Sequence, residues 1–282
     1  MSVFKIDQIT NRVGDAGTQI CGVTTFSGTS GIVMPSGNTL YKFVDPNLVT
    51  DALILQYDFS NSNSYPGSGN TVYDKVGGHN GTLYNSPTYS SNNGGYLSLS
   101  GSNDYIQVPN GTTMRWDNPH SIEFWVYPLG TGDSAQNILE ASYSVNMRIQ
   151  FDMSDTLGTG RAEAWVENAT GGDSLRVYNQ WFKPGAWHHL VITRSESLAT
   201  MYIDGKLDDG TADNGLNSGA QNSTLRTELP DNYTGTVYIG RYSGDAATEN
   251  FDGYISLFSI YQKSLSKDEV LQNYNAWKGR YQ

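Results

Sequence analysis

A series of short strand-like runs, separated by turn residues, constrains the fold of this chain more than any other feature. In one run, Met147, Ile149 and Phe151 share one face while polar residues occupy the other, as in a half-buried strand. Asp204-Gly205 between two such runs predicts a two-residue hairpin turn. This many short strands predicts an all-β, antiparallel sandwich or barrel. The runs are residues 53–57, 96–100, 105–108, 121–127, 147–151, 162–166, 190–193, 200–203, 237–240 and 254–260.

One helix is expected near the C-terminus. Ser266 and Glu269 have the spacing of a capping box, with Ser266 as the N-cap. Gly279 is placed to end the helix. We expect the helix to pack against the end of the sandwich through an apolar stripe of Val270, Leu271, Tyr274 and Trp277.

Residues 1–50 differ from the rest, because closely spaced glycines interrupt a few apolar residues there. These are too few for a core, and they lie mainly in short strand-like pieces at 23–26 and 32–34. The segment is either a flexible leader or an extended arm that becomes ordered by docking on a partner or another copy. We favour the arm because its apolar residues are grouped. The sandwich then occupies residues 51–282.

Composition excludes several classes of protein. A net charge of −11 argues against a general nucleic-acid binder, and 19 Tyr and 6 Trp are too many aromatic residues for a disordered chain. A lone cysteine, Cys21, permits no intrachain disulfide. The first residues do not resemble a signal peptide, and no apolar stretch is long enough to span a membrane. We therefore expect synthesis in a host cytoplasm without membrane insertion, and release by lysis as part of a virion.

An ordered set of short motifs covers residues 52–282. It includes Trp187-His-His-Leu-Val-Ile-Thr193, Met201-Tyr-Ile-Asp-Gly205 and Phe251-Asp-Gly-Tyr-Ile255. In this order the motifs resemble the laminin-G-like (LamG) branch of the concanavalin A-like lectin/glucanase superfamily. The resemblance implies a two-sheet antiparallel jelly-roll sandwich.

Three further segments resemble bacteriophage proteins. Ser64-Tyr-Pro-Gly-Ser-Gly69 and the closing Lys278-Gly-Arg-Tyr281 are similar to copies of this domain in phage virion proteins. The opening Met1-Ser-Val-Phe-Lys-Ile-Asp-Gln-Ile9 is similar to the leaders of virion structural proteins in marine phages. The resemblance implies a virion protein, for which a homo-oligomer, with a trimer favoured, is the expected assembly.

The resemblance also gives a catalytic motif to search for, because many glucanases of this superfamily carry Glu-x-Asp-x-x-Glu on one strand. No strand here has that spacing: Glu163 and Glu167 have no acidic residue between them, and Asp152 and Asp155 straddle a strand end. The pair His188-His189 lies where the family places structural residues, and Cys21 lies far in sequence from any histidine. We expect no catalytic residues and no enzyme.

Related domains often bind sugars, whose C–H faces stack on aromatic rings while polar side chains bond the hydroxyls. The alternative for Trp165 and Trp181 is that these side chains only cover the packed surface of the sheet or of a loop. The candidate glycan-binding residues are Arg148, Gln150, Glu163 and Trp165 at outward strand positions, with Tyr178 and Trp181 at the rim.

Calcium is the one cofactor that the resemblance suggests. Asp58 and Asp252 stand near the places where the family holds the ion. Ser256 stands where cellular relatives often have Asp, which argues against a site. We expect no cofactor.

These observations predict a non-enzymatic phage virion structural protein, namely a fibre, appendage or capsid decoration subunit. Residues 1–50 would bind other virion proteins, and the sandwich would display a lectin-like surface that binds host surface polysaccharide. The alternative is a free carbohydrate-binding lectin module. A glycan-cleaving enzyme is less favoured because the acidic set is missing.

Overall fold

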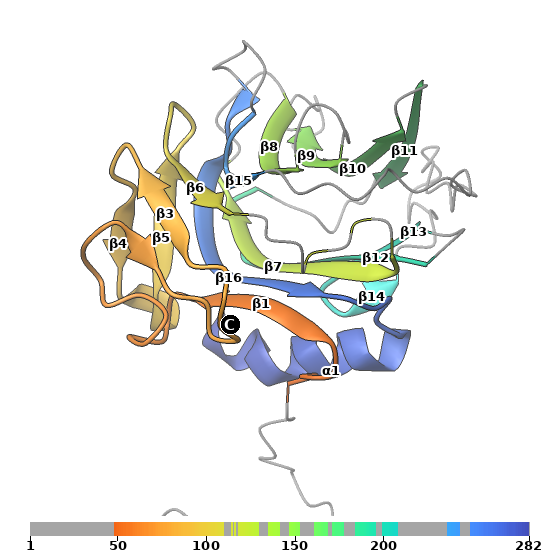
Figure 1. The fold of residues 1–282 in the computed structure, drawn as a ribbon, viewed down its shortest axis with the longest axis horizontal. Helices are drawn as coiled ribbons and strands as arrows, with labels where there is room; N and C mark the ends of the chain where they lie inside the picture. The colour runs from red at the N-terminus through yellow and green to blue at the C-terminus, as the bar shows by residue number, and fades with distance from the viewer. Residues whose placement is uncertain are drawn as a thin grey trace, which may run out of the picture. The chain divides into compact units, whose positions relative to one another are not determined.

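The described part of the chain folds into two antiparallel β-sheets that face each other, with one helix against the outside of one sheet (Figure 1). This confirms the predicted all-β, two-sheet antiparallel sandwich with one short C-terminal helix. Most of the predicted arm lies outside the described residues, so its boundary stays a prediction. The computed structural model describes residues 48–109, 114, 116, 118–129, 135–141, 147–152, 161–168, 171–177, 184–195, 199–207, 236–242 and 249–281.

Sheet A is built around two long strands, β7 and β16, which pair with each other along most of their length. β1 also pairs with β16, beside the main order. The order is β14 (Lys206–Leu207), β13 (Ala199–Ile203), β12 (His188–Arg194), β7 (His120–Pro128), β16 (Asp252–Tyr261), β5 (Tyr96–Ser100) and β4 (Thr88–Ser90), with β1 at Leu53–Asp58.

Sheet B covers the inner face of sheet A and is also antiparallel throughout (Figure 1). Its order is β11 (Gly171–Val177), β10 (Arg161–Asn168), β9 (Met147–Asp152), β8 (Ala135–Ala141), β15 (Val237–Ile239), β6 (Tyr105–Val108), β3 (Gly81–Tyr84) and β2 (Thr71–Val72).

β16 exchanges one neighbour for another at Ser256. Residues 252–255 pair with β5 and residues 257–261 pair with β1, and the register with β7 shifts between Ile255 and Leu257. Such a bulge leaves polar groups outside the regular ladder. Here Ser256 Oγ donates to the carbonyl of Gly95 at 2.6 Å, and its carbonyl accepts from the Phe59 N–H at 3.0 Å. Ser256 therefore joins three strands.

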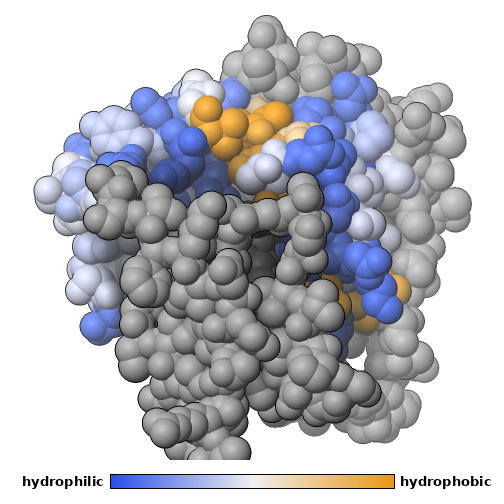
Figure 2. All heavy atoms as spheres, turned by 90° about the horizontal axis from the view of Figure 1, so that it is seen from below, coloured by the Kyte–Doolittle hydropathy of each residue, from blue (hydrophilic) through white to orange (hydrophobic). Residues whose placement is uncertain are grey.

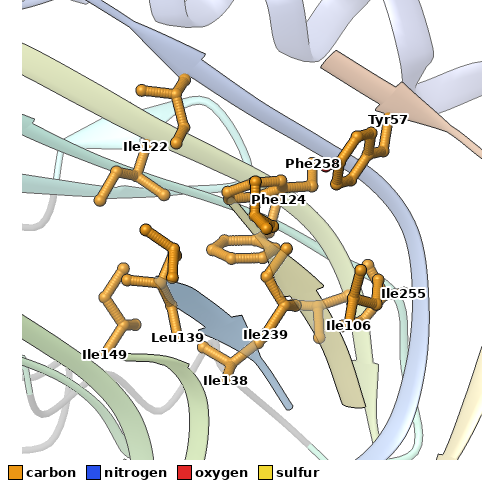
Figure 3. Close-up of a cluster of buried hydrophobic side chains, with 14 of the residues drawn as sticks. Tyr57, Ile106, Ile122, Phe124, Ile138, Leu139, Ile149, Ile239, Ile255 and Phe258 are labelled. Carbon is orange, nitrogen blue, oxygen red and sulfur yellow. The ribbon is translucent and has the colours of Figure 1, made fainter. Parts of the chain in front are cut away.

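The core fills the space between the two sheets (Figure 3). Phe124 of β7 and Phe258 of β16 lie 4.8 Å apart between ring centroids. They face Leu139 and Ile239 of sheet B. Ile149 and Phe151 of β9 are buried, as the alternation predicts. Burial of each such side chain contributes about 1.5–3 kcal/mol to stability.

The hairpin predicted at Asp204-Gly205 is confirmed. Ile203 pairs with Lys206, and Asp204 and Gly205 have φ angles of 52° and 74°. A type I′ turn requires positive φ at both central residues, which Asp and Gly tolerate.

Four strands of sheet B are absent from the sequence-based expectation, namely β2, β3, β8 and β11. β8 carries the polar residues Gln136, Asn137 and Glu140, which hide its alternation. β11 begins at Gly171 and Gly172, which pair with β10 although glycine is uncommon inside strands.

Helix α1 (Lys267–Trp277) begins at the predicted capping box. Ser266 Oγ accepts from the Glu269 N–H at 3.3 Å, and the Glu269 carboxylate accepts from the Ser266 N–H at 2.9 Å. The α-helix ends at Trp277 with Lys278 as its C-cap, directly before Gly279 as predicted, and a 3-10 turn, η3 (Lys278–Arg280), follows.

The predicted stripe of α1 is wrong at one position. Leu271 is 41% exposed, and Asn273 is fully buried instead. The predicted placement also differs, because α1 lies on the outer face of sheet A rather than at the end of the sandwich (Figure 1).

A buried polar network explains why Asn273 faces the sheet. The carboxylate of Glu123 on β7 lies 2.7 Å from His189 Nε2 and accepts from the Tyr261 hydroxyl at 3.2 Å. Asn273 Nδ2 donates to the Tyr261 hydroxyl at 2.9 Å, and Asn273 Oδ1 accepts from the Val49 N–H at 3.0 Å. Burial and the Glu123 charge raise the pKa of Tyr261, so its hydroxyl stays a donor. The network ties α1 and residue 49 to three strands of sheet A.

Replacing Asn273 with Ala should lower the free energy of unfolding by about 2–4 kcal/mol, because buried partners lose their hydrogen bonds. Urea denaturation measures the change. Asn275→Ala is the matched control, since Asn275 is exposed on the same helix and should change stability by less than about 0.5 kcal/mol. Equal losses for the two variants would contradict the role of the network.

Candidate functional site

Four of the six predicted glycan-binding residues occupy adjacent positions in sheet B. Gln150 on β9 pairs directly with Glu163 on β10, and Arg148 pairs directly with Trp165. Directly paired positions lie on the same face of a sheet. The structure thus brings the backbone positions of these four residues together. Tyr178 and Trp181 lie outside the described residues.

The described side chains at this end of the face are enclosed. Gln150 is 5% exposed, although the alternation predicts a solvent-facing position. Its neighbours on β8, Asn137 and Glu140, are also buried. Gln150 therefore does not present a free polar group to solvent in this structure, and its contact with a glycan stays a prediction.

The same face of sheet B continues across β8 and β15 to β6 and becomes more exposed there. Tyr238 on β15 pairs with Glu140 on β8, which in turn pairs with Arg148 on β9. On its other side Tyr238 pairs with Gln107 of β6. One row of positions thus runs from the predicted residues to an aromatic group that is at least partly exposed.

We call this group the tyrosine–arginine patch; it comprises Tyr84, Tyr105, Tyr238 and Arg241. The rings of Tyr84 and Tyr105 stack nearly parallel at 4.8 Å, and Tyr238 meets Tyr105 edge-on at 5.8 Å. The guanidinium of Arg241 lies 4.8 Å from the Tyr105 ring centroid and 5.6 Å from that of Tyr238. Contacts of this kind hold an arginine in place by cation–π attraction.

The chemistry of the patch suits a sugar. Tyr84 is 37% exposed and offers an aromatic surface at the edge of the group. Arg241 and Gln107 are both half-buried, and they carry hydrogen-bond donors beside it. The patch can hold a sugar ring against an aromatic side chain while the polar groups bond its hydroxyls.

Sequence reasoning missed the patch for an identifiable reason. Tyr105 and Tyr238 fall within the strand-like runs 105–108 and 237–240, so the sequence indicates only a structural role for them. Alternation was the available signal: Val237 and Ile239 are core residues, which places Tyr238 outward.

The two neighbouring histidines of the sequence analysis, His188 and His189, are each packed beside a carboxylate. His189 is fully buried beside Glu123, and His188 Nδ1 lies 3.0 Å from Asp204 Oδ2. Both histidines are thus packed and hydrogen-bonded, as predicted. The pairs Glu163/Glu167 and Asp152/Asp155 stay untested, because their side chains are not among those described. Cys21 lies outside the described residues.

Asp58, one of the two carboxylates considered for calcium, is already paired with a cation. The carboxylate of Asp58 accepts from Ser60 Oγ and lies 3.3 Å from Arg280 Nη1, so a cation already balances its charge. Ser256 Oγ accepts from the Tyr281 hydroxyl at 2.8 Å. No group of three or more His, Cys, Asp or Glu residues within the described ranges is arranged to hold a metal.

A profile of the Concanavalin A-like lectin/glucanases superfamily (Laminin_G_3) matches residues 100–271, more than half of the chain. A comparison with curated proteins finds no match. Within the described residues, no helix is long and apolar enough to cross a membrane.

Solved structures share the fold. Domain 4 of AbnA, an extracellular arabinanase from Geobacillus stearothermophilus in complex with arabinotriose, superposes with a TM-score of 0.57 and 18% identity, over 78% of this chain and 97% of that one. A structure of botulinum neurotoxin type C, whose cell entry depends on interaction with two ganglioside molecules, gives 0.58 and 14%, over 80% and 51%. Trypanosoma rangeli sialidase with 2,3-difluorosialic acid gives 0.57 and 15%, over 82% and 33%.

Calcium should leave the thermal midpoint of this protein unchanged, because Arg280 already neutralises Asp58. A ligand that binds only the folded state at 100 times its Kd adds about 2.7 kcal/mol of stability, which thermal scanning detects easily. Scans with millimolar calcium and with a chelator test this. A midpoint that calcium raises and the chelator restores would contradict the assignment.

Proposed function

The chain belongs to the concanavalin A-like lectin/glucanase superfamily, and we propose that it is a non-enzymatic phage virion structural protein whose sandwich binds host surface glycans. The observation that carries the glycan-binding part is the tyrosine–arginine patch. It lies on the same face of sheet B as the predicted residues Arg148, Gln150, Glu163 and Trp165.

The architecture supports binding at that face. The inner face of sheet B is buried in the core, so a ligand of this sheet binds on its outer face. Tyr84, Tyr238 and Arg241 are held there by ring and cation contacts before any ligand arrives. Preorganised side chains lose less entropy on binding, which favours affinity.

The ligand class follows from the fold and from the relatives. The arabinanase domain is solved with arabinotriose, and the neurotoxin depends on gangliosides. These facts concern those proteins, and they support a saccharide as the ligand of this one. A guanidinium beside aromatic rings further favours a sugar that carries a carboxylate or many hydroxyls.

Two buried carboxylates of sheet A support the non-enzymatic part of the proposal. Hydrolysis needs a pair of carboxyl groups that flank the bond and reach the substrate. Glu123 lies under α1 and bonds His189 and Tyr261, while Asp58 bonds Arg280. Neither is free to act as an acid or a nucleophile.

The virion role rests on the two-part sequence and on its resemblance to phage leaders. Residues 1–50 attach the protein to other virion proteins, and a homo-oligomer, with a trimer favoured, displays several sandwiches together. Several weak sugar sites on one particle act together, which raises the overall avidity. A free lectin module is the alternative.

Tyr84→Ala should weaken glycan binding at least about tenfold while the thermal midpoint stays within a few degrees, because the exposed ring stacks on the ligand and not in the core. A glycan array followed by calorimetry with the best ligand measures this. Tyr73→Ala is the matched control, since Tyr73 is also exposed, at 46%, and lies outside the patch. Equal binding by both variants, or no binding by the wild type, would overturn the proposal.

Deleting residues 1–45 should abolish incorporation into particles without unfolding the sandwich. The described sandwich has its own core, and the Val49 contact with Asn273 is retained. Quantifying the protein in purified particles tests incorporation, and circular dichroism of the truncated protein tests folding. Incorporation of the truncated protein at the wild-type level would contradict the attachment role of the arm, whereas absence of the full-length protein from particles would support the free lectin.

A further inference from the structure

A second aromatic group lies on the outer face of sheet A, on the opposite side of the sandwich. Tyr96 on β5, Tyr254 on β16 and Tyr127 on β7 are each half-buried and project from three adjacent strands. Their sequence neighbours Leu97, Ile255 and Val126 belong to the core, so the three tyrosines face outward. We call these residues the tyrosine ladder.

The ladder rings stack on each other rather than lying flat on the sheet. Tyr96 and Tyr254 lie 4.6 Å apart with planes inclined by 29°, and Tyr254 and Tyr127 lie 5.1 Å apart at 26°. Both faces of Tyr254 are thus covered, which leaves ring edges and hydroxyls toward solvent. Burial raises the pKa of Tyr254, and the nearby Tyr96, Tyr127 and Asp252 raise it further because a negative charge on Tyr254 would be repelled by them.

Trp187 lies across this ladder. Its ring centroid is 5.7 Å from Tyr96, 5.6 Å from Tyr127 and 6.3 Å from Tyr254, at interplanar angles of 45° to 68°. Tyr281 packs against it at 4.9 Å and itself stacks on Trp125 at 4.2 Å. Trp187 is therefore a half-exposed aromatic plane with rigid support.

Hydroxyl groups surround the ladder. Tyr254 pairs with Ser98, which pairs with Thr88 at the edge of sheet A, and Asp252 pairs with Ser100. Thr88 and Ser100 are exposed, and Ser98 is partly exposed. The positions paired with the ladder include no Lys or Arg. The described residues seen from the side of α1 are mostly hydrophilic, with hydrophobic residues confined to small areas (Figure 2).

We propose that the tyrosine ladder with Trp187 is a second saccharide-binding site, which takes a neutral sugar chain. An aromatic plane with hydroxyls beside it matches a ligand with alternating C–H faces and hydroxyls. The carboxylate of Asp252 beside Tyr254 disfavours an anionic ligand, whereas the tyrosine–arginine patch carries a cation. One chain thus presents two different sugar sites on opposite faces, and the second does not depend on the first.

Removing two hydroxyls while keeping both rings tests the site. The double variant Tyr127→Phe with Tyr254→Phe retains the stacking and should bind neutral oligosaccharides about tenfold or more weakly. The probes are neutral arabino-, xylo- and cello-oligosaccharides, measured by calorimetry on the full chain. Tyr73→Ala, which lies outside both aromatic groups, should leave this binding unchanged.

The outcomes separate the two sites. Weaker binding by the double variant, with normal binding by Tyr73→Ala and unchanged thermal midpoints, supports the second site whatever happens at the first. Binding that the double variant retains at the wild-type level, or no binding of any neutral probe, overturns it. Self-association of the wild type that the double variant abolishes would also overturn it, because a second copy would then cover the ladder.

Discussion

The pairing of β7 with β16 is the constraint on which the rest of the structure depends. One face of this pair supplies Phe124 and Phe258 to the core, and the other carries Glu123 and Tyr261 beneath α1. Because β16 is long, it also joins β5 to β1 through the bulge at Ser256. The helix, the first strand and the core are therefore all fixed by one strand pair.

Both candidate sites follow from this arrangement. The sheets bury their inner faces against each other, so aromatic residues at alternate positions must project outward. On sheet B these are Tyr84, Tyr105 and Tyr238 with Arg241. On sheet A, α1 and η3 cover part of the outer face, and the tyrosine ladder lies beside them. Part of the tyrosine content thus gathers on the two outer faces, while Tyr57 and Tyr65 belong to the core.

The sequence allowed the fold class and most central strands to be predicted, because their alternation is regular and their turns are sharp. It failed at β8, where buried Asn137 and Glu140 look like surface residues, and at α1, where Asn273 meets Glu123 across the fold. Such partners are distant in sequence, so local patterns do not reveal them. Strand pairing brings together the predicted positions on β9 and β10, which alternation in the sequence indicates. The burial of Gln150 and the contacts of Arg241 depend on packing between segments distant in sequence, so the sequence does not reveal them.

The central claim is that the outer face of sheet B binds a saccharide. A crystal structure of the full chain with its best array ligand tests this most directly. The account predicts a sugar ring against Tyr84, with its hydroxyls bonded by Arg241 or Gln107. A sugar bound to the chain with no contact to any residue of the tyrosine–arginine patch or of the adjoining row would contradict it.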